Sequence, residues 1–426
     1  MENTITEKRN WGKTLALGIQ HVLAMFGATV LVPALTGLDP SIALLCAGIG
    51  TLLFHFITKG KVPVFLGSSF AFIASIQTVL GTGDNFNPAN ISKVGGGLIC
   101  AGALYIIFAI IVKLVGVEKV RNFFPPVVTG PIIIVIGLSL APGVIDGNIL
   151  SNSTGELWQR LIIAGVVILT MLIVGVFAKG FFKLVPILFG IIAGFLVSLF
   201  FNGFVDFTAI EKANWFISFD QFYFPEFDLN AILVIAPMAI VTFMEHIGDI
   251  TTNSAVVGKD FMTDPGLHRT LIGDGIATMF AGLIGGPANT TYGENTGVLA
   301  VTKNYSPFNL RIAACFAILL GLFGKAGAFI RIIPAPVMGG VSIILFGMIA
   351  SIGIRLLGEN KVDLSENRNL FIVSVLLVVG VSVNIFVGPD SAIKISGLAI
   401  SAVLGIILNK ILPERKITEK VENPQK

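Results

Sequence analysis

Two stretches of this sequence decide how the chain folds. Residues 287–297 read PANTTYGENTG, and residues 62–72 read VPVFLGSSFAF. Both lie in apolar surroundings, yet both carry proline and glycine, which interrupt helices, beside polar side chains that can bond the freed backbone groups. At membrane depth, irregular backbone survives only where protein buries it or where it lines a wet cavity. The two stretches therefore predict broken membrane helices around a binding site, with two kinked structural helices as the plainer alternative.

The sequence around these stretches is typical of a membrane protein. Of its 426 residues, 54% are hydrophobic and 12% are charged, about half the charged share of a soluble domain. Apolar runs of about 18 to 22 residues recur along the chain, the length of a membrane-spanning helix. This pattern excludes a soluble enzyme, a coiled coil and a secreted disulfide protein, and it argues against an outer-membrane barrel with strands of about 10 residues.

Fourteen candidate spans follow from these runs. They are residues 14–35, 41–58, 62–80, 94–115, 124–142, 160–178, 184–202, 229–250, 270–285, 287–302, 309–327, 335–354, 370–388 and 392–412. With this even number, the side holding both termini carries 22 Lys and Arg residues and the other side carries 6. Positive residues stay in the cytoplasm, so we expect a multi-pass protein of the cytoplasmic membrane with both termini inside. The net charge of +3 points to no nucleic-acid partner.

The two halves of the chain resemble each other. Pro, Val, Gly, Ile, Ile and Gly recur in the same order in residues 126–137 and 336–347, at a fixed offset of 210. A chance match between apolar segments is the alternative. If the repeat is real, the halves 1–215 and 216–426 hold seven spans each, and the odd number inverts the second copy. Inverted repeats are typical of secondary transporters, and the two broken spans, third in each half, indicate the substrate site.

Four acids fall inside predicted spans: Glu245, Asp249, Asp274 and Glu294. A charge at the bilayer centre costs about 2.5–3.5 kcal/mol, and no matching set of Lys or Arg accompanies these acids. They are therefore expected to line a cavity, to be protonated, or both. Glu245 and Asp249 are four residues apart and share one helix face, where desolvation and mutual repulsion disfavour ionising both. A pair that can hold or release a proton predicts a coupling site.

Other chemistries have little support in the sequence. There is no HExxH, no Walker A motif and no His/Cys cluster, so we expect no metal site, no cofactor and transport driven by an ion gradient. A proton is the expected coupling ion, and sodium is the alternative because Asp249 and backbone carbonyls can hold a cation. An enzyme would need a nucleophile–base pair or a metal. Glu245 and Asp249 could mimic an aspartyl pair, but no second motif supports that interpretation.

Several motifs together resemble one known family. Glu294-Asn295-Thr296-Gly297, followed by Thr302-Lys303, is similar to the signature of the nucleobase–ascorbate (nucleobase:cation symporter) family. Residues 20–33, 67–72, 264–269 and 336–340 resemble the same family. The resemblance covers essentially the whole chain and is nearest to the bacterial members that transport uracil.

The resemblance implies a fold. It is an all-α polytopic membrane protein with 14 transmembrane segments in a 7+7 inverted repeat, and short β-strands in the broken third and tenth spans. Spans 1–4 and 8–11 would form a core domain, and spans 5–7 and 12–14 a gate domain. The family also implies a homodimer in membrane lipid.

The resemblance implies a substrate site as well. Glu245 and Glu294 would bind the nucleobase through their carboxylates, and backbone groups of Phe70 and Gly293 would complete the ring of hydrogen bonds. Uracil fits this chemistry, because carboxylates accept from its ring N–H groups and backbone N–H groups donate to its carbonyls.

Coupling and support fall to further residues. Asp249, with Glu245, is the expected proton-coupling position, although some uracil-type members carry histidine in the place of Asp249. His21, Tyr292 and Asp274 are expected to lie near the contact residues, with Tyr292 and Phe70 available to pack on the substrate ring.

The expected function is uracil import by proton symport, with alternating access between core and gate. A purine (xanthine, urate or guanine) permease is the alternative, but purine-type members more often carry glutamine where this chain has Glu294. An anion carrier of the same fold would need a buried positive charge at the site, and an ion channel would need rings of charge along a pore.

Overall fold

The protein consists mostly of helices. The computed structural model describes residues 11–81, 85–387 and 393–413. The first half holds α1 (Trp11–Thr36), α2 (Pro40–Ile57), α3 (Ile73–Leu80), α4 (Ile91–Val115), α5 (Val117–Phe123), α6 (Pro126–Ile145), α7 (Leu157–Phe177) and α8 (Pro186–Ser198). The second half holds α9 (Thr208–Lys212), α10 (Leu229–Ile235), α11 (Met238–Val257), α12 (Leu267–Ile284), α13 (Gly293–Thr302), α14 (Pro307–Leu322), α15 (Gly324–Arg331), α16 (Ala335–Glu359), α17 (Asn367–Ser382) and α18 (Gly397–Ile411).

Many of these helices are suited to a membrane. Within the described residues, seven helical segments are long and apolar enough to cross one: Trp11–Thr36, Pro40–Ile57, Pro88–Val115, Pro126–Leu150, Leu157–Phe177, Leu229–Val257 and Ala335–Glu359. Shorter apolar helices also fall on predicted spans, among them α8, α14, α17 and α18. The chain is therefore a multi-pass membrane protein built mainly from helices. The two tails, 1–10 and 414–426, lie outside the described residues.

Each broken stretch contains a short strand. β1 (Leu66–Ser68) pairs antiparallel with β2 (Asn289–Thr291), with Gly67 opposite Thr290, and both strands are fully buried. A short 3-10 turn leads from β1 into α3, and α13 begins two residues after β2. The strands expected in the third and tenth spans are thus confirmed. A second pair, β3 (Asn384–Val387) with β4 (Ile393–Ser396), precedes α18.

Several predicted spans are not single helices in the structure. Span 309–327 is divided between α14 and α15, span 370–388 ends in β3, and span 392–412 begins with β4. The division of span 229–250 matters most for the site. Residues 229–250 were expected as a single helix, but α10 ends at Ile235 and α11 begins at Met238. Pro237 lies at the break, because it has no N–H to continue the helix ladder. α11 then runs on to Val257, so Glu245 and Asp249 lie in the middle of a helix rather than near its end.

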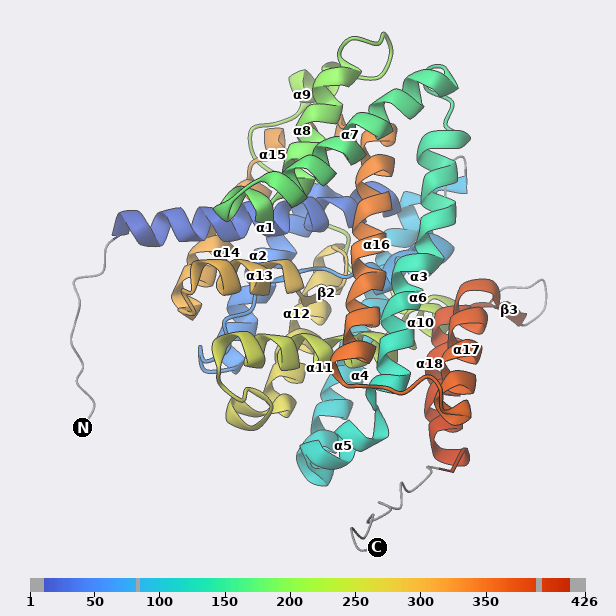
Figure 1. Cartoon of the computed structure of the whole chain (residues 1–426). Helices are drawn as coiled ribbons and strands as arrows, with labels where there is room; N and C mark the ends of the chain where they lie inside the picture. The colour runs from blue at the N-terminus through green and yellow to red at the C-terminus, as the bar shows by residue number, and fades with distance from the viewer. Residues whose placement is uncertain (1–10, 82–84, 388–392, 414–426) are drawn as a thin grey trace, which may run out of the picture.

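The closest helix pairs meet through glycine. α4 packs on α12, and a Cβ on Gly95 would collide with the carbonyl oxygen of Gly282. α6 packs on α16, and a Cβ on Gly353 would lie 2.5 Å from the carbonyl oxygen of Gly130. Figure 1 shows α6 and α16 side by side through the centre of the molecule. The two segments that carry the sequence repeat, 126–137 and 336–347, therefore belong to helices that pack against each other.

Candidate functional site

The acids of α11 lie against the second broken stretch. α11 packs on β2 and α13, and Glu245 and Asp249 are one turn apart and half-buried. Thr291 Oγ1 of β2 donates a hydrogen bond to Asp249 Oδ2 at 2.6 Å. The contact ties the acid-bearing face of α11 to the strand that leads into α13.

The start of α13 supplies the third acid. Glu294 lies in its first turn and is half-buried, where the N-terminal end of a helix favours a negative charge. Gly293, the preceding residue, is exposed, and a Cβ built on it would meet no atom within 4 Å. Glu245 and Asp249 lie on α11, which packs against α13, the helix that carries Glu294. The structure therefore brings the predicted acids together beside an open stretch of backbone.

Several buried polar atoms near the strand pair have no partner. Glu245 Oε2, Ser69 Oγ and Thr290 Oγ1 are buried and make no hydrogen bond within the part of the chain described. Buried polar groups are nearly always hydrogen-bonded. Donors and acceptors of this kind, gathered where two helices are broken, are what a small polar ligand needs.

Asp274 contacts His246, the residue that follows Glu245. It was expected near the start of a span, but α12 begins at Leu267 and Asp274 is two turns into it. Its Oδ2 lies 3.0 Å from Nδ1 of His246, and Nε2 of His246 lies 2.9 Å from Thr270 Oγ1. All three residues are buried, so Asp274 joins α12 to the residue that follows Glu245.

His21 and Tyr292 hold the broken stretches in place. Asn295 Nδ2 donates to the backbone oxygen of His21 at 3.0 Å, and lies 3.2 Å from its Nδ1, which links α1 to α13. The Tyr292 hydroxyl donates to the Ser68 carbonyl at 2.9 Å. The Tyr292 ring is 3% exposed and lies against Gly67, so its role in the structure is to brace the strand pair.

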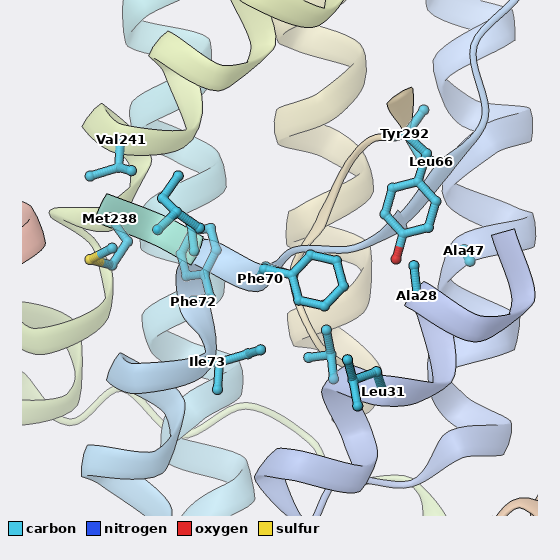
Figure 2. Packing of buried hydrophobic residues seen from close by; sticks show 14 of the residues in the cluster. Ala28, Leu31, Ala47, Leu66, Phe70, Phe72, Ile73, Met238, Val241 and Tyr292 are labelled. Carbon is cyan, nitrogen blue, oxygen red and sulfur yellow. The ribbon is translucent and has the colours of Figure 1, made fainter. Parts of the chain in front are cut away.

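Phe70 lies at the centre of a buried apolar cluster. Figure 2 shows its ring near Leu31, with Met238 of α11 on one side and Tyr292 on the other. The ring also meets Phe346 of α16 edge-on, with centroids 6.4 Å apart. Phe70 thus contacts helices from both halves of the chain.

A large cavity shares only Phe70 with the predicted site residues. It has a volume of about 760 Å³ and runs along α3 past Ala74 and Gln77. Its other walls come from the second half of α6 and from the segments around α17 and α18. Glu245, Gly293 and Glu294 do not line it. The hydrogen bonds and the exposed backbone at Gly293 therefore define the candidate site, because among its predicted residues only Phe70 lines the cavity.

Sequence reasoning missed one residue that organises the site. Asn253 Nδ2 donates to the Pro63 carbonyl and to Thr296 Oγ1, both at 3.1 Å, and so joins α11 to both broken stretches. The signal was present, because Asn253 follows Asp249 by four residues on the same face. Within the described residues, no group of three or more His, Cys, Asp or Glu side chains could hold a metal ion.

Comparison with known proteins establishes the family. A family model described as "Permease family" matches residues 12–387. The chain belongs to the nucleobase–ascorbate transporter family. The family resemblance expected from the sequence motifs is thereby confirmed.

Named relatives of this family match nearly the full chain. A probable uracil permease of Haemophilus influenzae is 46% identical over 413 residues, covering 97% of this chain and 97% of that protein. The uracil permease of Bacillus subtilis is 44% identical over 412 residues, covering 94% and 93%. That of Escherichia coli is 42% identical over 413 residues, covering 96% and 93%. The chain is thus a permease rather than an enzyme.

Solved structures of membrane transporters have a similar fold. The transmembrane domain of the cyanobacterial bicarbonate transporter BicA aligns with a TM-score of 0.61 at 13% identity, covering 94% of this chain and 98% of that one. The murine anion transporter Slc26a9, in an inward-facing state, aligns with a TM-score of 0.70 at 11% identity, covering 95% and 68%. At such low identity the likeness concerns the fold alone.

Proposed function

We propose that this permease imports uracil across the cytoplasmic membrane by proton symport. Three relatives named as uracil permeases, each more than 40% identical along nearly the whole chain, support the substrate. The observation that carries the mechanism is the hydrogen bond from Thr291 to Asp249, because it holds the acids of α11 at the start of α13.

The proposed architecture has fourteen spans in two inverted sets of seven, 1–215 and 216–426. Spans 1–4 and 8–11 form the core, and spans 5–7 and 12–14 the gate. The antiparallel pairing of β1 with β2 supports the inversion, since strands in corresponding places run in opposite directions. The cavity beside Phe70 supports alternating access, since α3 of the core lines one wall and α6 of the gate lines another.

In the proposed site, uracil lies between α11 and the start of α13. Its ring N–H groups donate to the carboxylates of Glu245 and Glu294, and its carbonyls accept from the backbone N–H groups of Phe70 and Gly293. The unpartnered Oε2 of Glu245 and the open space at Gly293 support this arrangement. His21, Tyr292 and Asp274 support the contact residues from behind.

Coupling is assigned to Asp249 together with Glu245. One turn apart in a water-poor site, the two carboxyls favour holding a proton between them rather than two negative charges. Asp249 exchanges this proton with solvent and so sets the protonation state of Glu245. Sodium coupling is the alternative, with Asp249 as a cation ligand. The ion gradient supplies the driving force for transport, so the proposal includes no cofactor.

An anion substrate fits this site poorly. The structural neighbours BicA and Slc26a9 are named for bicarbonate and anion transport, but three acids here surround the place where the substrate would lie. Repulsion between these acids and an anion would oppose binding. A neutral ring with N–H donors suits them, which leaves a purine as the rival substrate to uracil.

The orientation and assembly are proposals of the same kind. The excess of positive residues on one side supports cytoplasmic termini, and family membership supports a homodimer in membrane lipid. The cavity along α3 then opens to the outside.

Uptake of labelled uracil tests this function. Cells that lack their own uracil permease should accumulate uracil when they express this chain, and a protonophore should abolish accumulation. Excess unlabelled uracil should compete, and xanthine should not. Competition by xanthine alone would show that the substrate is a purine rather than uracil. Uptake that survives the protonophore but needs sodium would show that the coupling ion is sodium rather than the proton.

A further inference from the structure

A second cavity, apolar throughout, lies at the C-terminal end of α14. It has a volume of about 420 Å³, and every side chain lining it is hydrophobic. α14 and the residue after it supply one wall, including Leu319, Leu322 and Phe323, and Phe216 and Ile217 supply the other. We call this the α14 groove.

Backbone hydrogen bonds hold the two walls together. The N–H of Ile217 donates to the Leu322 carbonyl at 3.0 Å, and the N–H of Gly324 donates to the Trp215 carbonyl at 2.9 Å. Phe216 and Phe323 face each other as an antiparallel bridge. The walls are therefore fixed, yet the groove is open on one side, with Phe216 70% and Leu319 61% exposed.

Beyond the groove, the side chains change from apolar to an aromatic tryptophan and then to a positively charged lysine. The Phe323 ring on the groove wall meets the Trp215 ring edge-on at 5.6 Å, and the Lys325 ammonium lies 5.7 Å from the centre of the Trp215 ring. Lys325 Nζ donates to the carbonyls of Ile210 and Glu211, at 2.6 and 3.3 Å. Among the described residues it forms no ion pair with a carboxylate, so its positive charge is not neutralised.

This order matches a phospholipid. Apolar wall, tryptophan and lysine follow one another as acyl chain, ester region and phosphate do in a lipid leaflet, and tryptophan is enriched at that interface. A lysine near the surface attracts anionic lipid. A groove with fixed walls can contact an acyl chain on more than one side, which a convex helix face cannot.

We propose that the α14 groove binds one acyl chain of an anionic phospholipid, with the lipid phosphate beside Lys325. This site is separate from the proposed substrate site and does not depend on what the protein transports.

Fluorescence quenching of Trp215 tests the proposal. The full-length protein with Trp11→Phe and Trp158→Phe keeps Trp215 as its single tryptophan. It is reconstituted into phosphatidylcholine vesicles that contain rising fractions of phosphatidylglycerol or phosphatidylcholine brominated in the acyl chains. We expect the brominated phosphatidylglycerol to half-quench Trp215 at about one fifth of the fraction needed for brominated phosphatidylcholine, the preference that one lysine near the surface provides.

Matched variants separate the headgroup from the acyl chain. Lys325→Gln should abolish the preference for phosphatidylglycerol. Lys212→Gln, which changes an exposed lysine at the end of α9, should keep it. Leu319→Phe with Leu322→Phe fills the groove and should weaken quenching of Trp215 by both lipids. In a protein that keeps only Trp158, the same filling should change nothing.

Three results would overturn the proposal. Equal quenching by the two lipids would show that Lys325 does not bind the lipid phosphate. If filling the groove leaves the quenching of Trp215 unchanged, no acyl chain occupies the groove. A Trp215 that no brominated lipid quenches shows that a second copy or another partner covers the groove instead.

Discussion

Asp249→Asn separates substrate binding from proton coupling. In the structure Asp249 Oδ2 accepts a hydrogen bond from Thr291 Oγ1 at 2.6 Å, and the amide oxygen of asparagine can accept the same bond. The contact between α11 and β2 should therefore persist. Because Glu245 and Glu294 also remain, we expect uracil affinity to fall by at most about tenfold, equivalent to about 1.4 kcal/mol. The amide cannot take up or release the proton, so uphill uptake should stop.

The assay pairs two measurements on purified protein. Uracil binding is measured in detergent, and uptake driven by a pH gradient is measured in proteoliposomes. Exchange of internal for external uracil should survive in Asp249→Asn, because exchange needs no net proton release. Full pH-driven accumulation by this variant would refute the reasoning and leave Glu245, or a sodium site, as the coupling element.

Two control variants isolate the effect of the proton. Thr291→Val keeps the acid but removes its hydrogen-bond donor, which should cost about 1–3 kcal/mol in the free energy of unfolding while pH-driven uptake persists. Asp264→Asn removes an exposed acid that pairs with Lys61 at 2.5 Å, and should leave both binding and coupling unchanged.

Further substitutions test the contacts, the packing and the orientation. Glu294→Gln presents an N–H donor to a ring N–H, a mismatch of about 1–3 kcal/mol or roughly 5- to 150-fold in affinity; normal uracil binding in detergent would remove Glu294 from the site. Gly67→Ala puts a methyl group into the Tyr292 ring and should destabilise the protein by about 1–3 kcal/mol, whereas Gly293→Ala, which has open space, should keep the melting temperature and lose uracil affinity. Equal melting temperatures for the two glycine variants would contradict the packing described. A cysteine at exposed Asn214, in a cysteine-free background, should react with an impermeant thiol reagent in intact cells, and reaction only after permeabilisation would invert the topology.

Local signals in the sequence were enough for the broken stretches and the acids. Proline, glycine and small polar residues inside an apolar run predict a break wherever they occur, and both β1 and β2 lie in such runs. The four-residue spacing of Glu245 and Asp249 places both on one helix face without knowledge of the fold. Pro237 offered the same kind of signal for the break between α10 and α11, which was not predicted.

Contacts between distant segments could not be predicted in this way. His246 meets Asp274 across 28 residues, and Asn253 meets Pro63 across 190. Spacing along one helix says nothing about which partner lies opposite. The position of the large cavity could not be predicted either, because it depends on how α3, α6 and α18 are placed around Phe70.

Proton movement with uracil tests the central claim most directly. The wild-type protein is reconstituted into proteoliposomes that enclose a pH-sensitive dye in weakly buffered, sodium-free medium. Adding uracil outside should acidify the interior, and Glu245→Gln and Asp249→Asn should abolish that acidification. Uptake of labelled uracil with no change in internal pH would contradict proton symport.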